Sequence, residues 1–332
     1  MKNLLGRFPH LARTLARVDL RVVETPVERW SVDGTLLLAK RDDLTTATLG
    51  GNKVRALELL LADIGPDHTV LTVGPTGSTH AMATAHFCGR LGARCEVITW
   101  PQEMHEVSRA TSSRLERLAA VKRTRSFPSA YLRATVRRLR ADLRWIPAGG
   151  SSPLGAIGHV NAALELIDQL AAEQTEMPDS IVVPLGSGGT VAGLLVGLSI
   201  AGAATRVIAV RVVPKAIGNR MRVLRLARRT RALLSRLADR SIAPLDEALL
   251  EIDNGWYGGA YGRETTEARN AAELLRFSGG PPLDGTYSAK TFARALARAR
   301  EEPDQRVLFW LTFDGRWLDE IQDPPPIMRP PR

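Results

Sequence analysis

The sequence predicts an α/β protein whose sheets are largely parallel. Short runs rich in β-branched residues alternate with longer segments of helical periodicity along most of the chain. This alternation is typical of parallel strands joined by helical crossovers. With 332 residues, of which 44% are hydrophobic, the chain is long enough for two globular domains or one large one.

The first half of the chain contains three predicted strands, and three predicted helices follow the turn at 74–77. The strands are expected at 35–40, 69–73 and 95–100. A turn at 74–77 precedes a helix that Ser78 or Thr79 can cap and that continues to Leu91. The other helices are expected at 107–118 and 129–143, before a loop rich in glycine and serine at 146–155.

The second half repeats the alternation. Strands are expected at 180–183, 207–213 and 307–312. Helices are expected at 159–173, 191–200, 264–276 and 288–300, with a further arginine-rich helix after Pro214. A loop rich in glycine and aromatic residues spans 254–261, and the proline-rich tail 324–332 is predicted to be disordered.

The formal net charge of +10 comes from arginine, because the 45 basic residues include six lysines and therefore 39 arginines. Arginines cluster at 114–144 and 220–240, and such clusters are one signature of nucleic-acid binding. Their interleaving with leucine and alanine at helical spacing instead favours solvated faces of amphipathic helices. We therefore expect no nucleic-acid partner, whereas an anionic substrate is compatible with the charge.

The sequence contains no uninterrupted apolar run of about 18 residues, so no membrane-spanning helix is predicted. Arginine and histidine interrupt the first twenty residues, which is unlike a secretory signal. Cys88 and Cys95 are too few for a disulfide framework or a metal site, and no histidine pair has metal-ligand spacing. We expect a cytoplasmic protein that holds no metal.

The segment Gly-Gly-Asn-Lys at 50–53 is the first candidate for chemistry. The two glycines allow close approach of the backbone, and an apolar run of helical spacing follows Lys53. Lys53 is therefore expected in the first turn of a helix at the edge of a cleft. The positive end of a helix lowers the pKa of a lysine, as a Schiff-base lysine requires. Taken alone, the segment favours a solvated lysine after a turn.

The second candidate is the glycine-rich segment 184–190, which lies between a predicted strand and a predicted helix. Glycines let successive backbone amides converge on an anion, and the helix start adds its positive end. No Gly-Lys-Ser/Thr follows, and Arg211 stands where a dinucleotide site needs an acidic residue. The segment therefore indicates the phosphate of a small cofactor, and a tight turn between strand and helix is the alternative.

Pyridoxal phosphate would join the two candidates, because it carries an aldehyde for Lys53 and a phosphate for the glycine-rich loop. The relevant motifs are KRDD at 40–43, GGNK at 50–53, IPAGGSSPLGAIGHV at 146–160, GSGGTVAGL at 186–194 and LDGTYSAKTF at 283–292. In this order and spacing the chain resembles the fold-type-II pyridoxal-phosphate enzymes over roughly residues 35–315. Within them it resembles the D-cysteine desulfhydrase and 1-aminocyclopropane-1-carboxylate (ACC) deaminase family.

The resemblance implies a tryptophan-synthase-β-like fold of two α/β domains with pyridoxal 5'-phosphate in the cleft between them. The large domain would comprise 1–45 and 157–332, and the smaller domain, 46–156, would be inserted in it. A homodimer is also implied.

The resemblance assigns expected roles to individual residues. Lys53 corresponds to the Schiff-base lysine, and Ser78 to the serine that holds the substrate carboxylate. Tyr261 and Tyr287 correspond to tyrosines with acid or nucleophilic roles. The residues expected to bind the cofactor are Lys53, Asn52, Thr79, Gly186, Ser187, Gly188, Gly189, Thr190 and Thr312. Those expected to contact the substrate are Ser78, Thr79, His80, Tyr261 and Tyr287.

Three departures from the family pattern put the substrate in question. Thr79 replaces an asparagine that would reach the phenolic oxygen of the cofactor, and Met82 replaces an arginine in the following helix. Phe313 and Asp314 stand where the family has two small residues after Thr312. Either Thr312 or Asp314 can then meet the pyridine nitrogen.

The reaction implied begins when an amino acid takes the place of Lys53 on the cofactor. The freed Lys53 is a candidate base for the Cα proton, and loss of a β-substituent would give a 2-oxo acid and ammonia. A cyclopropane substrate has no Cα proton and would need nucleophilic or β-proton attack. The alternatives are a diverged enzyme of β-replacement or racemisation, and a non-catalytic ligand-binding relative, against which the retained Lys53 and glycine-rich loop argue.

Overall fold

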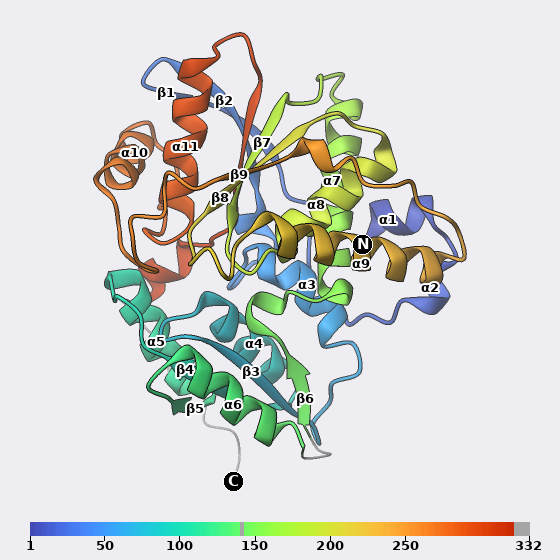
Figure 1. The fold of residues 1–332 in the computed structure, drawn as a ribbon, viewed down its shortest axis with the longest axis vertical. Helices are drawn as coiled ribbons and strands as arrows, with labels where there is room; N and C mark the ends of the chain where they lie inside the picture. The colour runs from blue at the N-terminus through green and yellow to red at the C-terminus, as the bar shows by residue number, and fades with distance from the viewer. Residues whose placement is uncertain (140–142, 322–332) are drawn as a thin grey trace.

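The computed structural model describes residues 1–139 and 143–321, and the predicted disordered tail lies outside them. The described chain forms two separate sheets, one above the other in Figure 1. The smaller sheet is built from residues 69–146, and the larger from residues on either side of that stretch. The expected division into two domains, with boundaries at 46 and 156, stays a prediction.

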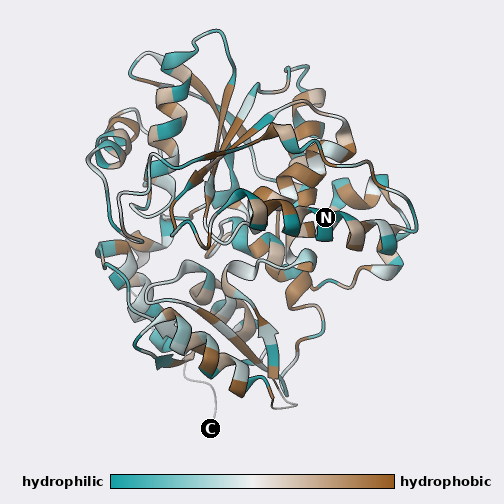
Figure 2. Ribbon diagram, viewed as in Figure 1, coloured by the Kyte–Doolittle hydropathy of each residue, from teal (hydrophilic) through white to brown (hydrophobic). Residues whose placement is uncertain are grey.

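The larger sheet is mixed, with one antiparallel hairpin at its edge and parallel pairing elsewhere. Its strands follow the order β1 (Val27–Val32), β2 (Thr35–Arg41), β10 (Val307–Leu311), β7 (Ser180–Leu185), β8 (Arg206–Arg211) and β9 (Leu250–Asp253). The central strands β10 and β7 are buried along their whole length, which is expected for strands covered on both faces. The strands are apolar in Figure 2, as this burial requires.

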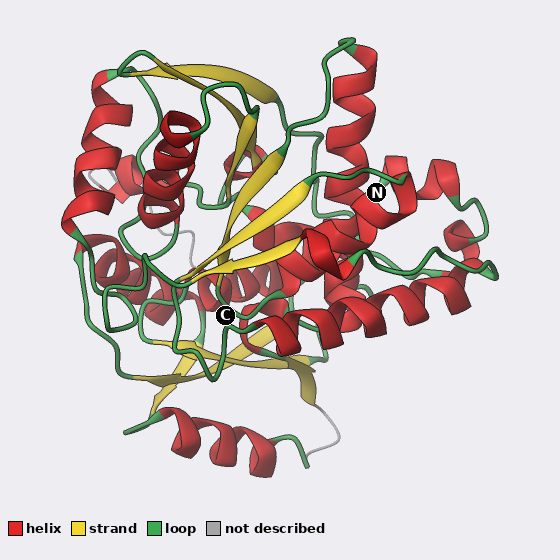
Figure 3. Cartoon of the chain, turned by 45° about the horizontal axis from the view of Figure 1, so that its top comes forward, coloured by secondary structure: helices red, strands yellow, loops and turns green. Residues whose placement is uncertain are grey.

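Helices cover both faces of the larger sheet (Figure 3). One face packs against α1 (Lys2–Arg7), α2 (Leu11–Thr14), α7 (Pro153–Ala172), α8 (Gly189–Ala201) and α9 (Arg220–Ala238). The other face packs against α10 (Thr266–Phe277) and α11 (Ser288–Glu301). The arginine-rich α9 buries an apolar stripe that includes Val223 and Leu234 and exposes most of its arginines, as an amphipathic surface helix does.

The smaller sheet is fully parallel. Its strands follow the order β5 (Ala120–Arg123), β4 (Arg94–Trp100), β3 (Thr69–Pro75) and β6 (Leu143–Ile146). The helices α3 (Asn52–Leu60), α4 (Thr79–Arg90) and α5 (Glu106–Leu118) share one hydrophobic cluster with it. The helix α6 (Phe127–Arg137) packs through Ala130 and Ala134 on the opposite face.

The α/β class is confirmed, and the six predicted strands and the predicted helices each have a counterpart in the structure, with corrections at the ends. The helix predicted at 129–143 ends at Arg137, and its last residue belongs to strand β6. The helix predicted from His159 begins at Pro153, where Ser152 Oγ accepts a hydrogen bond from the Gly155 amide. A serine followed by proline is a helix-start signal that the sequence carried.

Four strands were missed, namely β1, β5, β6 and β9. They are short or partly exposed, so they lack the continuous apolar runs that mark the buried strands. Short 3-10 turns at Asp42–Leu44, Ala148–Gly150, Glu247–Leu249 and Arg316–Ile321 complete the structure. No helix in the described part of the chain has the length and apolar character needed to cross a membrane.

A buried ionic network fixes α3 between the two sheets. Arg55, on α3, pairs with Asp42 at 2.7 Å and with Glu165 of α7 at 2.8 Å. Lys40 Nζ approaches the same Glu165 carboxylate at 2.8 Å, and Trp310 Nε1 donates to Asp42 at 2.8 Å. All of these side chains are almost completely buried, so removing one partner would leave an uncompensated charge. The KRDD motif therefore serves to anchor the helix that begins at Asn52.

Candidate active site

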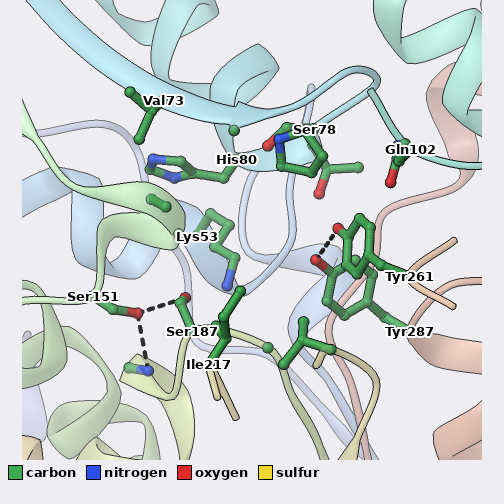
Figure 4. Close-up of a pocket in the computed structure, with 18 of the residues that line it drawn as sticks. Lys53, Val73, Ser78, His80, Gln102, Ser151, Ser187, Ile217, Tyr261 and Tyr287 are labelled. Carbon is green, nitrogen blue, oxygen red and sulfur yellow. Dashed lines mark hydrogen bonds between the residues drawn. The ribbon is translucent and has the colours of Figure 1, made fainter. Parts of the chain in front are cut away.

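A cavity of about 900 Å³ lies between the two sheets, and Figure 4 shows part of its lining. Its walls include the carboxyl ends of parallel strands from both sheets, for example Pro75 at the end of β3, Gly186 after β7 and Thr312 after β10. Ligand sites of open parallel sheets lie at this edge, because the loops that follow the strands converge there. The position and size of the cavity are those of a small-molecule site.

Lys53 projects into this cavity from the first turn of α3, as the sequence predicts (Figure 4). Close packing requires glycine at both positions before Asn52, namely Gly50 and Gly51. Gly51 has a φ of +99°, and a Cβ there would lie 2.8 Å from the Thr312 carbonyl oxygen. A Cβ on Gly50 would lie 2.3 Å from the Asp43 carbonyl oxygen. The backbone before Lys53 therefore rests directly on the loops that follow β2 and β10.

Burial of the amine lowers the pKa of Lys53 to about 8. The direction agrees with the sequence-based expectation, but the cause differs, since burial rather than the helix end accounts for it. A substantial share of the amine is therefore uncharged in mildly alkaline solution, as a Schiff-base lysine requires.

The glycine-rich loop 186–190 forms a cup at the start of α8, opposite Lys53. Gly188 has a φ of +93°, which turns the chain into the helix and directs first-turn amides toward the cavity. Asn52 Nδ2 donates to Thr190 Oγ1 at 2.8 Å, so the helix of Lys53 is bonded to the cup. The cup presents backbone amides and hydroxyl groups, a donor set that suits a phosphate.

Ser151 belongs to the cup and was not predicted individually. Its Oγ donates to Ser187 Oγ at 2.7 Å and accepts from the Gly189 amide at 3.0 Å (Figure 4). A Cβ on Gly189 would lie 2.7 Å from the same oxygen, so only glycine permits this approach. The Gly-Ser loop was recognised in the sequence, but its contact with the cup depends on the packing of α7 against α8.

The start of α4 forms a second donor site in the cavity wall. Ser78 Oγ accepts from the Ala81 amide at 3.3 Å and caps the helix. The amides of Thr79 and His80 lie in the first turn, where no earlier carbonyl of the helix can accept from them. These amides and the Thr79 hydroxyl group are available for an anion such as a carboxylate.

The His80 imidazole lines the cavity next to β3, and its contact with a substrate stays a prediction (Figure 4). His80 is 3% exposed, and its Nε2 lies 3.1 Å from Thr72 Oγ1 of β3. Burial lowers the pKa of His80 to about 3, so the ring is neutral. The His80 backbone amide, in the first turn of α4, is a further donor at this wall of the cavity. His159, which the sequence left open, is buried in α7 behind the cavity.

Tyr261 and Tyr287 form a pair on another wall of the cavity, with their hydroxyl groups hydrogen-bonded to each other (Figure 4). Asp284 holds the second tyrosine in place, because its carboxylate accepts from the backbone amides of Thr286, Tyr287 and Ser288. Burial raises the pKa of Tyr287 to about 12 and that of Tyr261 well above its usual value. Both phenols are therefore protonated at neutral pH and are donors rather than nucleophilic phenolates.

Thr312 and Asp314 are the two candidates for a partner of a pyridine nitrogen. The contacts of Asp314 favour Thr312. One oxygen accepts from the Gly50 amide at 2.8 Å, and both accept from the Arg316 guanidinium at 2.8 and 2.9 Å. Because the carboxylate is already neutralised, Thr312, whose side chain lines the cavity, is the better candidate.

Two of the departures noted in the sequence contact a common hydrophobic cluster. Met82 and Phe313 pack together with Leu49 and Trp317. Phe313 therefore fills space beside the methionine that stands where the family has an arginine. This wall of the cavity is apolar as a consequence.

Comparison with known proteins identifies the family. The family described as pyridoxal-phosphate dependent enzyme matches residues 18–312. The chain belongs to this family. Within it, the chain is 34% identical over 330 residues to the nocardicin C-9' epimerase of Nocardia uniformis, covering 94% of this chain and 97% of that relative.

Two further relatives carry the names expected from the motifs. The chain is 32% identical to the D-cysteine desulfhydrase of Serratia proteamaculans, covering 93% of this chain and 94% of that relative. It is 31% identical to a putative ACC deaminase of Pyrococcus furiosus, covering 93% of both. The crystal structure of an ACC deaminase homologue superposes with a TM-score of 0.76 at 28% identity, covering 97% of this chain and 99% of that one. These relatives support a pyridoxal-phosphate dependent lyase or deaminase.

The residues of the cavity fit the cofactor of this family. The cup and Ser151 supply amides and hydroxyls for a phosphate, and they lie in the same cavity as an amine of lowered pKa. Residues that would hold the cofactor are Lys53, the loop 186–190, Ser151 and Thr312.

Proposed function

We propose that this pyridoxal-phosphate enzyme removes the Cα proton of an amino acid and releases a 2-oxo acid and ammonia. For an amino acid that carries a β-substituent X, the balance is amino acid plus water giving HX, 2-oxo acid and ammonia. The observation that carries the proposal is the placement of the Lys53 amine, the anion cup and two protonated tyrosines in one cavity.

The bound cofactor supplies an aldehyde for a Schiff base and an electron sink for the pair of electrons left at Cα. The chain supplies orientation. The amides of Thr79 and His80, with the hydroxyls of Ser78 and Thr79, are suited to hold the substrate carboxylate. That anchor would fix the Cα–H bond relative to Lys53 Nζ, since the cofactor end is fixed by the cup.

Lys53 is proposed as the base that takes the Cα proton, because its lowered pKa makes the free amine available near neutral pH. Tyr261 and Tyr287 are proposed as a shared proton donor to the leaving group or to carbon. Their raised pKa values, caused chiefly by burial, favour donation over attack as a phenolate. The hydrogen bond between them lets one tyrosine stabilise the other after donation.

Epimerisation is the second candidate, and one arrangement favours it. Lys53 enters from α3, whereas the tyrosine pair enters from the 254–261 loop and the start of α11 (Figure 4). A base and an acid from separate elements would allow a proton to be removed and returned at Cα without loss of a substituent. A relative at 34% identity bears the name of an epimerase.

A single experiment separates the two reactions. The holoenzyme is incubated in D₂O with each enantiomer of a series of amino acids, and proton NMR follows both Cα deuteration and 2-oxo acid release. Release of 2-oxo acid by the wild type but not by Lys53→Ala is the expected result. Deuteration and inversion without 2-oxo acid would replace the proposal with epimerisation. A protein that forms no Schiff-base absorption band with added cofactor would be a non-catalytic relative, and both reactions would be rejected.

We also propose a homodimer in the cytoplasm, on the basis of the family resemblance and of two buried cysteines that form no disulfide. Light scattering coupled to size exclusion would give twice the chain mass, 36.2 kDa, if the dimer forms. A monomer at micromolar concentration would contradict it.

A further inference from the structure

The cavity continues beyond the reaction centre into a group of four aromatic side chains. We call Trp100, Phe127, Tyr131 and Trp145 the aromatic annex; they come from β4, α6 and β6 of the smaller sheet. Ring centroids lie 5.1 Å apart for Trp100 and Phe127 and 4.6 Å apart for Phe127 and Tyr131. Trp145 lies 6.5 Å from Tyr131.

The annex is not a sealed core. Phe127 is 39% exposed, the other three rings are half-buried, and all four line the cavity. Aromatic faces that remain partly exposed in a concave wall are typical of a site that stacks a ring of the ligand. A three-carbon amino acid held at Lys53 and α4 would leave these faces uncovered.

The charges around the cavity are unbalanced. Each lining carboxylate is already engaged: Glu103 pairs with Arg263, Asp284 accepts three backbone amides, and Asp314 pairs with Arg316. Two lining arginines, Arg138 and Arg222, form no ion pair within residues 1–139 and 143–321. Among the described residues, the cavity lining therefore carries two positive charges without a paired carboxylate.

Both arginines border the annex, from different elements. The Arg138 guanidinium stacks on Trp145, with its carbon 4.8 Å from the ring centroid. Arg222 lines the same cavity as Tyr131, and its positive charge lowers the pKa of that tyrosine, although burial raises the pKa more strongly. Arg222 belongs to the first turn of α9, where the positive helix end disfavours a cation. An anion bound by the two arginines would offset the unfavourable effect of the helix end on Arg222.

We infer that the cavity selects an amino acid whose side chain carries an aromatic ring with an anionic group. The ring stacks in the annex, and the anionic group lies between Arg138 and Arg222. This inference rests on the proposed function, because it requires the amino and carboxyl groups at the reaction centre. It adds to that function a substrate class larger than the small amino acids expected from the sequence.

One competing role for Arg222 must be separated from this one. Val223 Cγ2 would lie 3.4 Å from a Cβ on Gly188, so the first turn of α9 also borders the phosphate cup. In that role Arg222 would strengthen cofactor binding and leave amino-acid preference unchanged. Cofactor affinity and amino-acid affinity are therefore measured on the same variants.

Isothermal titration of the holoenzyme uses alanine, phenylalanine and 4-carboxyphenylalanine, each as both enantiomers. For the preferred enantiomer, we expect phenylalanine to bind about tenfold more tightly than alanine, because its ring is buried in the annex. We expect 4-carboxyphenylalanine to bind about tenfold more tightly than phenylalanine, because its carboxylate accepts charge-assisted hydrogen bonds. Arg222→Gln and Arg138→Gln should each remove most of the second gain and leave the first.

Arg225→Gln is the matched control, because Arg225 is exposed on the same helix and does not line the cavity. All three arginines are solvent-exposed, and thermal unfolding midpoints check that the variants fold. If alanine binds and the larger amino acids bind no more tightly, the inference is wrong and the proposed function stands. If Arg222→Gln weakens the cofactor alone, the anion site is wrong. If no amino acid binds, the proposed function fails and the inference falls with it.

Discussion

Asn52 Nδ2 donates a 2.8 Å hydrogen bond to Thr190 Oγ1, which joins the helix of Lys53 to the last residue of the anion cup. The amine and the phosphate site therefore keep a fixed separation although they lie 137 residues apart in the sequence, from 53 to 190. The Asn52 amide also donates to the Thr312 carbonyl at 3.2 Å, so the loop after β10 is bonded to the start of α3 as well.

Asn52→Ala should weaken cofactor binding about tenfold, because a hydrogen bond in a low-dielectric site is lost and the Thr190 hydroxyl is left free to rotate. The measurement is a titration of apoenzyme with pyridoxal phosphate followed by absorbance. Asn3→Ala is the control, since Asn3 makes a hydrogen bond of the same length to Asp168, on α1 and α7. Equal effects of the two substitutions would contradict the role of Asn52.

Arg55→Met should lower the free energy of unfolding by about 3–5 kcal/mol, because it leaves Asp42 and Glu165 buried without their partner. Urea denaturation of the apoenzyme measures this loss. Arg7→Met removes an ion pair to Asp168 that is about one third exposed, and it should cost about 1 kcal/mol or less. A similar small loss for Arg55→Met would show that α3 is anchored by other contacts.

The rate of cofactor capture by the apoenzyme should rise as the pH increases through about 8. Below the lowered pKa of Lys53 the ammonium form prevails and is not nucleophilic, and above it the free amine prevails. Stopped-flow absorbance over a range of pH gives the midpoint. Lys53→Ala should form no band, and Lys122→Ala, at an exposed lysine of β5, should behave as the wild type. A midpoint near the ordinary lysine pKa would contradict the effect of burial.

Tyr287→Phe and Tyr261→Phe should each lower kcat by about 10²–10⁴-fold, as expected for loss of a general acid. Because the two hydroxyls share one hydrogen bond, the double variant should lose little more than the worse single variant. Tyr257→Phe, in the same loop as Tyr261, is the control. Full additivity in steady-state kinetics would mean that the tyrosines act separately.

Gly51→Ala should destabilise the protein and impair cofactor binding, because its Cβ would lie 2.8 Å from the Thr312 carbonyl oxygen. Gly34→Ala is a matched control. Gly34 also has a positive φ, +74°, but nothing lies within 4 Å of its Cβ position, so only the backbone cost of about 1 kcal/mol applies. Equal losses of stability and of cofactor affinity in the two variants would show that the packing of Gly51 has no effect of its own.

Much of the architecture was predictable because it depends on local patterns. The buried strands β3, β7 and β10 show as apolar runs, and α4 and α11 show as helical periodicity with an initial serine. The exposed β5 and the short β9 carry no such pattern. Their pairing follows from the neighbouring strand, which the sequence does not reveal.

The departures at Met82 and Phe313 also show what the sequence reveals and what only the structure shows. Each is visible in the sequence as an unexpected residue, and neither is near the other there. In the structure they pack in one cluster, so the loss of a charge at one position accompanies a gain of apolar volume at the other. Contacts of this kind depend on the tertiary fold alone.

The sequence by itself determined the α/β class, the position of Lys53 after two glycines and the glycine-rich cup after a buried strand. These features follow from short-range sterics and periodicity, which act within a few residues. The tertiary structure decided that Ser151 completes the cup, that Asp314 is neutralised by Arg316 and that the His80 ring bonds Thr72. It also placed Arg222 and Tyr131 in the walls of one cavity, because only the packing of the two sheets around a common cavity sets distances between segments so far apart.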